Sequence, residues 1–178
     1  MKYICVFCGS QTGNDQVYAR TTAELARAIV ARGMGVVYGG GSIGLMGVLA
    51  DATLAAGGRI TGVIPQALAE REIAHDGLSE LRIVTSMHER KALMADLSDA
   101  FIALPGGYGT LDELCEAITW TQLGIHDKPI GLLNVNGYFD SLLALFDHAV
   151  ANGFVSHDNR KLICDARDIP ALFTALTL

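Results

Sequence analysis

The 178-residue sequence has few charged side chains and no large basic cluster. Charged residues make up 18% of the chain, and 13 basic against 19 acidic residues give a formal net charge of −6. No run of basic residues is longer than two, as at Arg90 and Lys91. Because nucleic-acid binding depends on clustered Lys and Arg side chains that neutralise phosphates, we expect no nucleic-acid partner.

Features of a membrane or secreted protein are also lacking. The longest uncharged stretch, residues 33–50, contains seven glycines and is therefore a poor membrane helix. Residues 1–4 lead directly into a strand-like pattern, so we expect no signal peptide and no membrane partner. Four cysteines in such a chain are expected to be reduced thiols in the cytoplasm.

Metal-ligand spacing is absent from the histidines, and the one CxxC pair has no second pair nearby. That pair, Cys5 and Cys8, lies inside an apparent strand, which favours structural thiols over zinc or redox chemistry. We therefore expect neither a metal nor a cofactor.

Hydrophobic residues, in contrast, are abundant. They make up 51% of the chain and give a mean hydropathy of +0.34, which is high for a soluble protein. A chain of this length suits one domain that buries roughly 70% of its unfolded surface. Part of the apolar excess is expected to cover a subunit interface, which predicts a homo-oligomer, most simply a two-fold dimer.

Apolar strand-like runs alternate with helical patterns along most of the chain. This alternation predicts a single α/β domain over residues 1–178, a Rossmann-like, doubly wound, parallel sheet with helices on both faces. A less regular stretch precedes Ser79, and the tail from Ser156 is expected to hold two short helical pieces at most. The predicted strands are 3–7, 35–38, 60–64, 81–84, 101–104 and 130–133, and the predicted helices are 16–32, 45–56, 88–97, 111–123 and 138–151.

Glycine-containing turns follow three of the predicted strands, at residues 8–10, 39–47 and 106–109. In open α/β sheets, ligands bind outside the carboxyl ends of the strands. We therefore expect the three turns to line one crevice. Besides the third turn, the residues expected to bind ligand there are Gly9, Ser10, Gly41 and Ser42.

Segment 105–113 has the sequence PGGYGTLDE and lies between a predicted strand and a predicted helix. Its glycines allow backbone N–H groups to approach an anion, and a helix start adds unpaired donors and a favourable dipole. The same turn carries a hydroxyl and two carboxylates. The sequence therefore predicts a site for chemistry on a phosphorylated small molecule.

A purely structural alternative exists for this segment, because Thr110 and Glu113 have the spacing of a capping box. The density of preceding glycines exceeds what a plain cap needs, which favours the binding site. Glu116 lies one turn beyond Glu113 on the same helix face. It either supports the site or forms the polar edge of the helix.

Residues 39–44, GGGSIG, formally match two further patterns. The GxGxxG pattern of dinucleotide sites needs an acidic residue about 20 positions on, but the next strand ends in GVIP, so we favour a phosphate-facing loop. Tight helix–strand packing is the alternative. The GxSxG pattern would make Ser42 a nucleophile, yet three glycines give little of the rigid turn required, so we favour Ser42 as a ligand hydrogen-bond donor.

A second informative segment covers residues 86–91, SMHERK. Ser86 and Glu89 have the spacing of a capping box, which predicts a helix start. Arg90 and Lys91 then lie near the N-terminal end of that helix, where positive charge opposes the dipole. Such a broken local rule is expected at functional sites. The two cations fit an anionic ligand, with a solvated basic pair as the alternative.

Together these motifs resemble those of the LONELY GUY (LOG) family of cytokinin riboside 5′-monophosphate phosphoribohydrolases. Segment 105–113 resembles the family's PGGxGTxxE motif, and residues 87–91 resemble its MxxRK segment. Residues 38–47 and 7–10 are also similar to the family, so the resemblance covers nearly the whole chain.

PGGxGTxxE is shared with related Rossmann-like proteins, some of which are labelled lysine decarboxylases. A pyridoxal-type decarboxylase needs a lysine for a Schiff base. None of the four lysines, Lys2, Lys91, Lys128 and Lys161, has an obviously apolar setting in the sequence.

The resemblance implies hydrolysis of the N-glycosidic bond of AMP or N6-substituted AMP, giving a free adenine-type base and ribose 5-phosphate. It implies that Glu113 and Arg90 are catalytic, that Met87 and Lys91 of the MxxRK segment bind substrate, and that the enzyme is a dimer or a multiple of dimers. A non-catalytic nucleotide or phosphorylated-cofactor binder, similar to molybdenum-cofactor carriers, is the alternative. The residues implied to hold the phosphate are Gly106, Gly107, Gly109 and Thr110.

Overall fold

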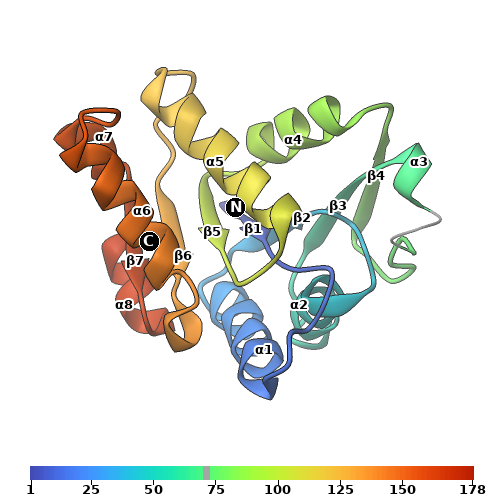
Figure 1. Ribbon diagram of the computed structural model, residues 1–178. Helices are drawn as coiled ribbons and strands as arrows, with labels where there is room; N and C mark the ends of the chain where they lie inside the picture. Colours follow the sequence, from blue (N-terminus) through green and yellow to red (C-terminus); the bar gives the residue numbers. More distant parts are fainter. Residues whose placement is uncertain (70–72) are drawn as a thin grey trace.

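The structure, a computed structural model, describes residues 1–69 and 73–178 and contains one seven-stranded sheet (Figure 1). The strand order is β4-β3-β2-β1-β5-β6-β7, and every pairing within it is parallel. This arrangement confirms the predicted Rossmann-like, doubly wound α/β fold. The strands are β1 (Tyr3–Phe7), β2 (Gly35–Tyr38), β3 (Ile60–Pro65), β4 (Glu80–Val84), β5 (Ala100–Ala103), β6 (Ile130–Leu133) and β7 (Ile163–Ala166).

Helices cover both faces of the sheet (Figure 1). Helices α1, α2 and α8 pack into one hydrophobic cluster, and α4, α5 and α6 pack into the other. Among the described residues, no helix combines the length and apolar character needed to cross a membrane. The helices are α1 (Gln16–Ala31), α2 (Gly44–Ala55), α3 (Gln66–Ala69), α4 (Met87–Asp96), α5 (Tyr108–Gln122), α6 (Asp140–Ala151), α7 (His157–Arg160), α8 (Ile169–Ala175) and the 3-10 turn η1 (Val135–Gly137).

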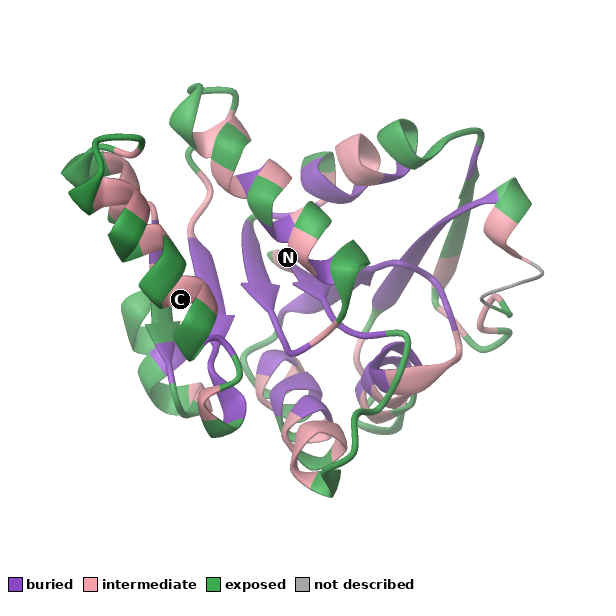
Figure 2. Ribbon diagram, viewed as in Figure 1, coloured by how far each residue is buried: buried purple, intermediate pink, exposed green. Residues whose placement is uncertain are grey.

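The central strands are apolar throughout because both of their faces are covered. In β1, Ile4 and Val6 belong to the cluster under α1 and α2, whereas Cys5 and Phe7 belong to the cluster under α4 and α5. Successive side chains of a strand point to opposite faces, so a strand between two helical layers needs no polar alternation. Figure 2 shows these strands buried and the outer helix surfaces exposed.

Most predicted elements agree with the structure to within one residue, but three differ. Helix α5 begins at Tyr108 instead of residue 111, because Gly107 serves as its N-cap without a side-chain bond. The helix expected over 138–151 begins at Asp140, after η1. The tail contains strand β7 between its two short helices, contrary to expectation. Of the irregular stretch before Ser79, residues 70–72 lie outside the described part of the chain.

Candidate active site

A cavity of about 220 Å³ lies at the carboxyl ends of the central strands. Strand order reverses there, since β1 has β2 on one side and β5 on the other. This is the topological switch point at which open α/β sheets bind ligands. All three glycine-containing turns contribute to the cavity wall, through Cys8 and Ser10, through Gly39, and through Gly107 and Gly109.

The N-terminus of α5 forms one side of this cavity. Gly107 caps the helix, and the first intrahelical bond runs from the N–H of Leu111 to the Gly107 carbonyl at 3.1 Å. The N–H groups of the residues before Leu111 therefore have no intrahelical acceptor. Together with the helix dipole they make a favourable place for an anion.

The capping-box interpretation of this segment is wrong. Thr110 is the third residue of α5, not its cap, and only 4% of it is exposed. Its hydroxyl lies close to Gly106, and the residue also lines the cavity. Glu113 is consequently inside the second turn of the helix, where its side chain lines the same cavity.

The three motif glycines have different physical roles. A Cβ on Gly106 would lie 2.1 Å from the Thr110 hydroxyl and 2.8 Å from the Gly9 nitrogen, so packing requires glycine there. A Cβ on Gly107 or Gly109 would meet no described atom within 4 Å, and neither residue has a positive φ. Packing and backbone conformation therefore leave these two glycines unexplained, and glycine at both positions leaves room for a ligand to approach their N–H groups.

Arg90 is a buried cation in the cavity wall. Its Nε donates to the Val63 carbonyl at 3.1 Å and its Nη2 donates to the Gly39 carbonyl at 2.7 Å. Val63 lies in the second half of β3 and Gly39 directly follows β2, so the sheet itself orients the guanidinium. A Cβ on Gly39 would lie 2.2 Å from Nη2, which explains the glycine at that position.

Lys91, the next residue, has a different setting. Its Nζ contacts Asp112 at 3.0 Å and Glu116 at 2.9 Å, so it connects α4 to α5. Burial lowers the pKa of Lys91, but the bonds to Glu116 and Asp112 outweigh it and raise the pKa overall. Lys91 and Glu116 are not among the lining residues of the main cavity. They line a smaller adjacent cavity together with Glu113.

Glu113 also lies near the end of β1. Burial, followed by the Glu113 carboxylate, raises the pKa of the Cys8 thiol far above its ordinary value. Burial and the same carboxylate raise the pKa of Cys5. Both cysteines are free, and the raised pKa values oppose formation of a thiolate nucleophile at either one.

Besides Lys91 and Glu116, four candidate binding residues do not line the cavity: Gly9, Gly41, Ser42 and Gly106. Gly9 donates to the Pro105 carbonyl at 3.1 Å and packs against Gly106, thereby joining the first and third turns. Gly41 accepts from the Tyr38 hydroxyl, and the Ser42 N–H donates to Ile73. Among the described residues, these contacts of Gly9, Gly41 and Ser42 hold the turns together and do not place the three residues in the cavity wall.

Backbone conformation and packing explain most of the glycines in the GGGSIG loop. Gly40 and Gly44 have φ of +82° and +61°, and a Cβ on Gly44 would lie 2.2 Å from the Ser10 carbonyl carbon. A catalytic Ser42 would also need an available histidine. His75, which is bonded to this loop, uses Nε2 on Asp51 and Nδ1 on the Gly77 N–H, so both ring nitrogens are occupied.

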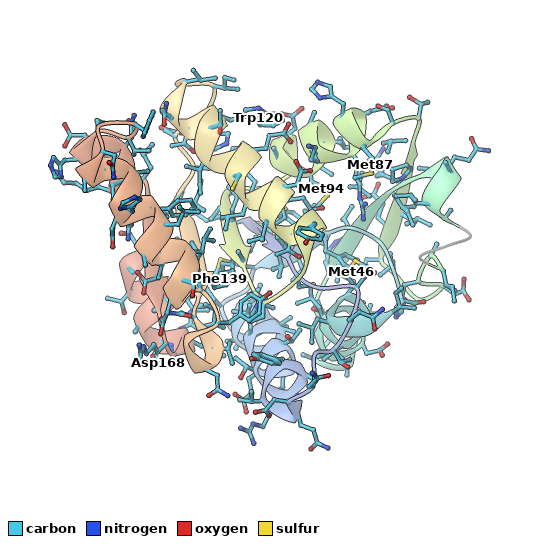
Figure 3. The ribbon with its side chains drawn as sticks, in the orientation of Figure 1. Met46, Met87, Met94, Trp120, Phe139 and Asp168 are labelled. Atoms are coloured by element: carbon cyan, nitrogen blue, oxygen red, sulfur yellow. The ribbon has the colours of Figure 1, made fainter. Side chains whose placement is uncertain are left out.

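An apolar wall completes the cavity, and Met87 is the one residue of this wall that was expected from the sequence to bind substrate. Met46 on α2, Met87 on α4 and Leu68 on α3 contribute to it, and Figure 3 shows the two methionines near the space between α2, α4 and α5. Met87 belongs to segment 87–91 and Met46 to segment 38–47, both of which resemble the LOG family. Met46 and Leu68 reach the cavity through tertiary packing, for which the sequence carries no local signal.

This combination of an open helix N-terminus, a buried arginine and a glutamate at the switch point defines a Rossmann-like protein with a site for an anionic small molecule. Residues 46–176 match a family described as "Possible lysine decarboxylase". The chain is 58% identical over 163 residues to "Probable cytokinin riboside 5'-monophosphate phosphoribohydrolase LOGL1" of Oryza sativa subsp. japonica, covering 92% of this chain and 73% of that protein. It is 56% identical over 165 residues to cytokinin riboside 5'-monophosphate phosphoribohydrolase LOG1 of Arabidopsis thaliana, covering 93% and 78%.

The chain therefore belongs to the LOG family. Among solved structures, it is similar to the molybdenum cofactor carrier protein of Chlamydomonas reinhardtii, with a TM-score of 0.74 and 22% identity over 99% of each chain. At that identity the similarity establishes a shared fold.

The lysine decarboxylase description does not fit the residues of the site. Such an enzyme holds a pyridoxal cofactor on a lysine. Lys91 is bound by two carboxylates, the Lys128 Nζ donates to the Ala95 carbonyl at 2.7 Å, and the Lys161 Nζ contacts Asp158 at 2.9 Å. Lys2 is exposed, and none of the four lysines is among the described residues that line the cavity.

Proposed function

We propose that this protein hydrolyses the N-glycosidic bond of AMP and N6-substituted AMP and releases the free base and ribose 5-phosphate. The observation that carries the proposal is the presence of Glu113 and the open N-terminus of α5 in one cavity. The names of the relatives that are over 50% identical support the same reaction.

Phosphate binding at the start of α5 fixes the ribose relative to Glu113. Gly107, Gly109 and Thr110 line the cavity at that point, and Glu113 follows one turn later. Binding energy from the non-reacting phosphate thereby orients the anomeric carbon. A nucleoside without the phosphate would lack this contact, so its anomeric carbon would not be held next to Glu113.

Glu113 then stabilises the cationic sugar that forms as the base departs. The bond between C1′ and the base nitrogen breaks, a water oxygen bonds to C1′, and one water proton ends on the leaving base. A carboxylate close to C1′ lowers the energy of the oxocarbenium-like transition state, as in glycosidases. Arg90 supplies fixed positive charge in the same wall, held by the carbonyls of Val63 and Gly39.

The direct test is incubation of the purified protein with AMP and with isopentenyladenosine monophosphate, followed by chromatography of the free base. We expect adenine and isopentenyladenine, with one ribose 5-phosphate for each base. Folded protein that binds either nucleotide tightly but releases no base would instead be a non-catalytic carrier.

We also propose that the enzyme is a cytoplasmic homodimer or a multiple of dimers. Large apolar side chains are exposed directly after α5, within α6 and directly after α6, at Leu123, Ile125, Leu145 and Phe154. No residue of α6 is buried, although most of its sequence is apolar. All four cysteines are free thiols, which supports a reducing compartment. Light scattering coupled to size-exclusion chromatography measures the oligomeric mass.

Replacing Gly109 by alanine tests the role of the open helix start. Gly109 is the second residue of α5 and a Cβ there meets no described atom, so we expect the free energy of unfolding to stay constant or rise by up to about 1 kcal/mol. The added methyl group enters the phosphate-binding space, so ribose 5-phosphate binding should weaken at least about tenfold, a loss of about 1.4 kcal/mol. Denaturant unfolding and calorimetric titration measure the two effects.

Alanine at Gly153, which is also surrounded by open space but lies far along the chain in the turn after α6, is the matched control for a glycine replacement. Because Gly153 has a φ of +75°, that variant should lose stability without losing ribose 5-phosphate affinity. A Gly109→Ala protein with unchanged affinity would contradict the proposed phosphate position.

A further inference from the structure

A tyrosine from outside every recognised motif contacts the PGGYGT turn. The Tyr138 hydroxyl donates to the Gly106 carbonyl at 2.5 Å, across 32 residues of sequence. Tyr138 follows η1, in the connection between β6 and α6. This contact therefore ties the phosphate-binding turn to a loop on the neighbouring strand.

The bond fixes the direction of one backbone donor. The Gly106 carbonyl and the Gly107 N–H belong to the same planar trans peptide, so they point in opposite directions. Glycine on both sides gives this peptide unusual rotational freedom. By holding the carbonyl, Tyr138 sets where the Gly107 N–H points, and Gly107 lines the cavity. Accepting a hydrogen bond at the carbonyl also polarises the amide and strengthens its N–H as a donor.

The loop that carries Tyr138 is itself well anchored. The neighbouring Phe139, labelled in Figure 3, is buried, and its N–H donates to the Asn134 side chain at 2.8 Å. The Asn134 amide in turn donates to Asp140 at 2.7 Å. The Tyr138 ring packs edge-on against Tyr18 of α1, with 6.1 Å between ring centroids. A hydroxyl on such a loop is placed without much loss of conformational entropy.

We propose that Tyr138 is a positioning residue for the substrate phosphate, acting through the Gly106–Gly107 peptide. This inference rests on the proposed function for the identity of the ligand. Tyr138 is not a catalytic residue, since its hydroxyl bonds to the turn and not to reacting atoms. It adds to the family motifs a residue that makes binding selective for phosphorylated over unphosphorylated nucleosides.

The test is Tyr138→Phe, which removes the hydroxyl and keeps the ring that packs on Tyr18 and Phe139. We expect the Kd for ribose 5-phosphate and the KM for AMP to rise about 3- to 10-fold, the range that one net hydrogen bond supplies. We expect kcat to stay within about twofold and the Kd for adenosine to be unchanged. The split between phosphorylated and unphosphorylated ligands is a readout that a general loss of structure would not produce.

Tyr18→Phe is the matched control, because it removes a neighbouring hydroxyl for which the described residues offer no hydrogen-bond partner. It should leave all four quantities unchanged. Equal weakening of AMP and adenosine by Tyr138→Phe, or no weakening of either, would overturn the proposal, as would a wild-type protein that binds no ribose 5-phosphate.

The experiment also distinguishes failure of the positioning role of Tyr138 from failure of the proposed hydrolysis. If the wild-type protein binds ribose 5-phosphate and Tyr138→Phe weakens that binding, the positioning role stands even where no base is released. Calorimetric titration with ribose 5-phosphate requires no turnover, so the two results are obtained separately.

Discussion

Replacing Glu113 by glutamine is expected to lower kcat for AMP by about 10²- to 10⁴-fold, the range typical of loss of a positioned catalytic carboxyl group. Glutamine keeps the size of the side chain but removes the negative charge that stabilises the cationic sugar. Glu113 lies in the second turn of α5, beyond the start of the helix at which we propose that the phosphate binds. The Kd for AMP should therefore change by no more than a few-fold, and the effect should appear in kcat.

The change in charge has an independent spectroscopic consequence. Because the Glu113 carboxylate contributes to the raised pKa of the Cys8 thiol, its neutralisation should lower that pKa. The rate at which a thiol reagent modifies Cys8 in the folded variant should rise with the thiolate fraction, and it is measured in the absence of substrate. Glu24→Gln, on the exposed face of α1, is the matched control and should leave kcat unchanged. A Glu113→Gln enzyme with a near-normal rate would remove Glu113 from the mechanism.

The sheet was predictable from the sequence because its strands are buried on both faces. Runs such as 3–7 and 101–104 lack polar alternation and lie next to strong helical patterns, which is typical of parallel sheets. Strand β7 escaped prediction for the opposite reason. Its four residues, ICDA, include a charged side chain, and the strand forms through pairing with β6. No local pattern records such a long-range partner.

Helix α5 shows a similar limit at its N-terminus. Thr110 and Glu113 match the capping-box spacing, but Gly107 caps the helix with its backbone alone. A side-chain cap leaves a recognisable residue pattern in the sequence, whereas the backbone cap at Gly107 leaves only glycines. The glycine density in segment 105–113 was therefore the more informative feature.

Arg90 and Lys91 were predicted to act together, and the structure separates them. Consecutive residues of an α-helix project about 100° apart, and here Arg90 lines the main cavity whereas Lys91 does not. Arg90 points to the ends of β2 and β3, whereas Lys91 points to α5. The contact of Tyr138 with Gly106 and the place of Met46 in the cavity wall both depend on tertiary packing. Neither can be predicted from a local sequence pattern.

Replacing Arg90 by lysine is expected to lower kcat/KM by about 10²- to 10³-fold, the cost of removing one preorganised donor from an active site. Lysine keeps a positive charge but lacks the planar fork that bonds the carbonyls of Val63 and Gly39 at the same time. A buried carbonyl left without a donor costs about 1–3 kcal/mol, so stability should also fall. For a protein of this length the melting temperature should decrease by about 2–4 °C per kcal/mol. Arg82→Lys, at an exposed ion pair with Glu80, is the matched control and should change neither quantity.

A second variant distinguishes the effect of the position of the Arg90 guanidinium from the effect of its charge. In Gly39→Ala the new Cβ would lie 2.2 Å from Nη2, so the guanidinium must move although the arginine remains. If the held geometry of Arg90 matters, Gly39→Ala should lose most of the activity that Arg90→Lys loses. The double variant should then lose little more than either single one, because both changes disrupt the same interaction. Additive losses, measured as kcat/KM for AMP, would show that Gly39 acts on the substrate independently of Arg90.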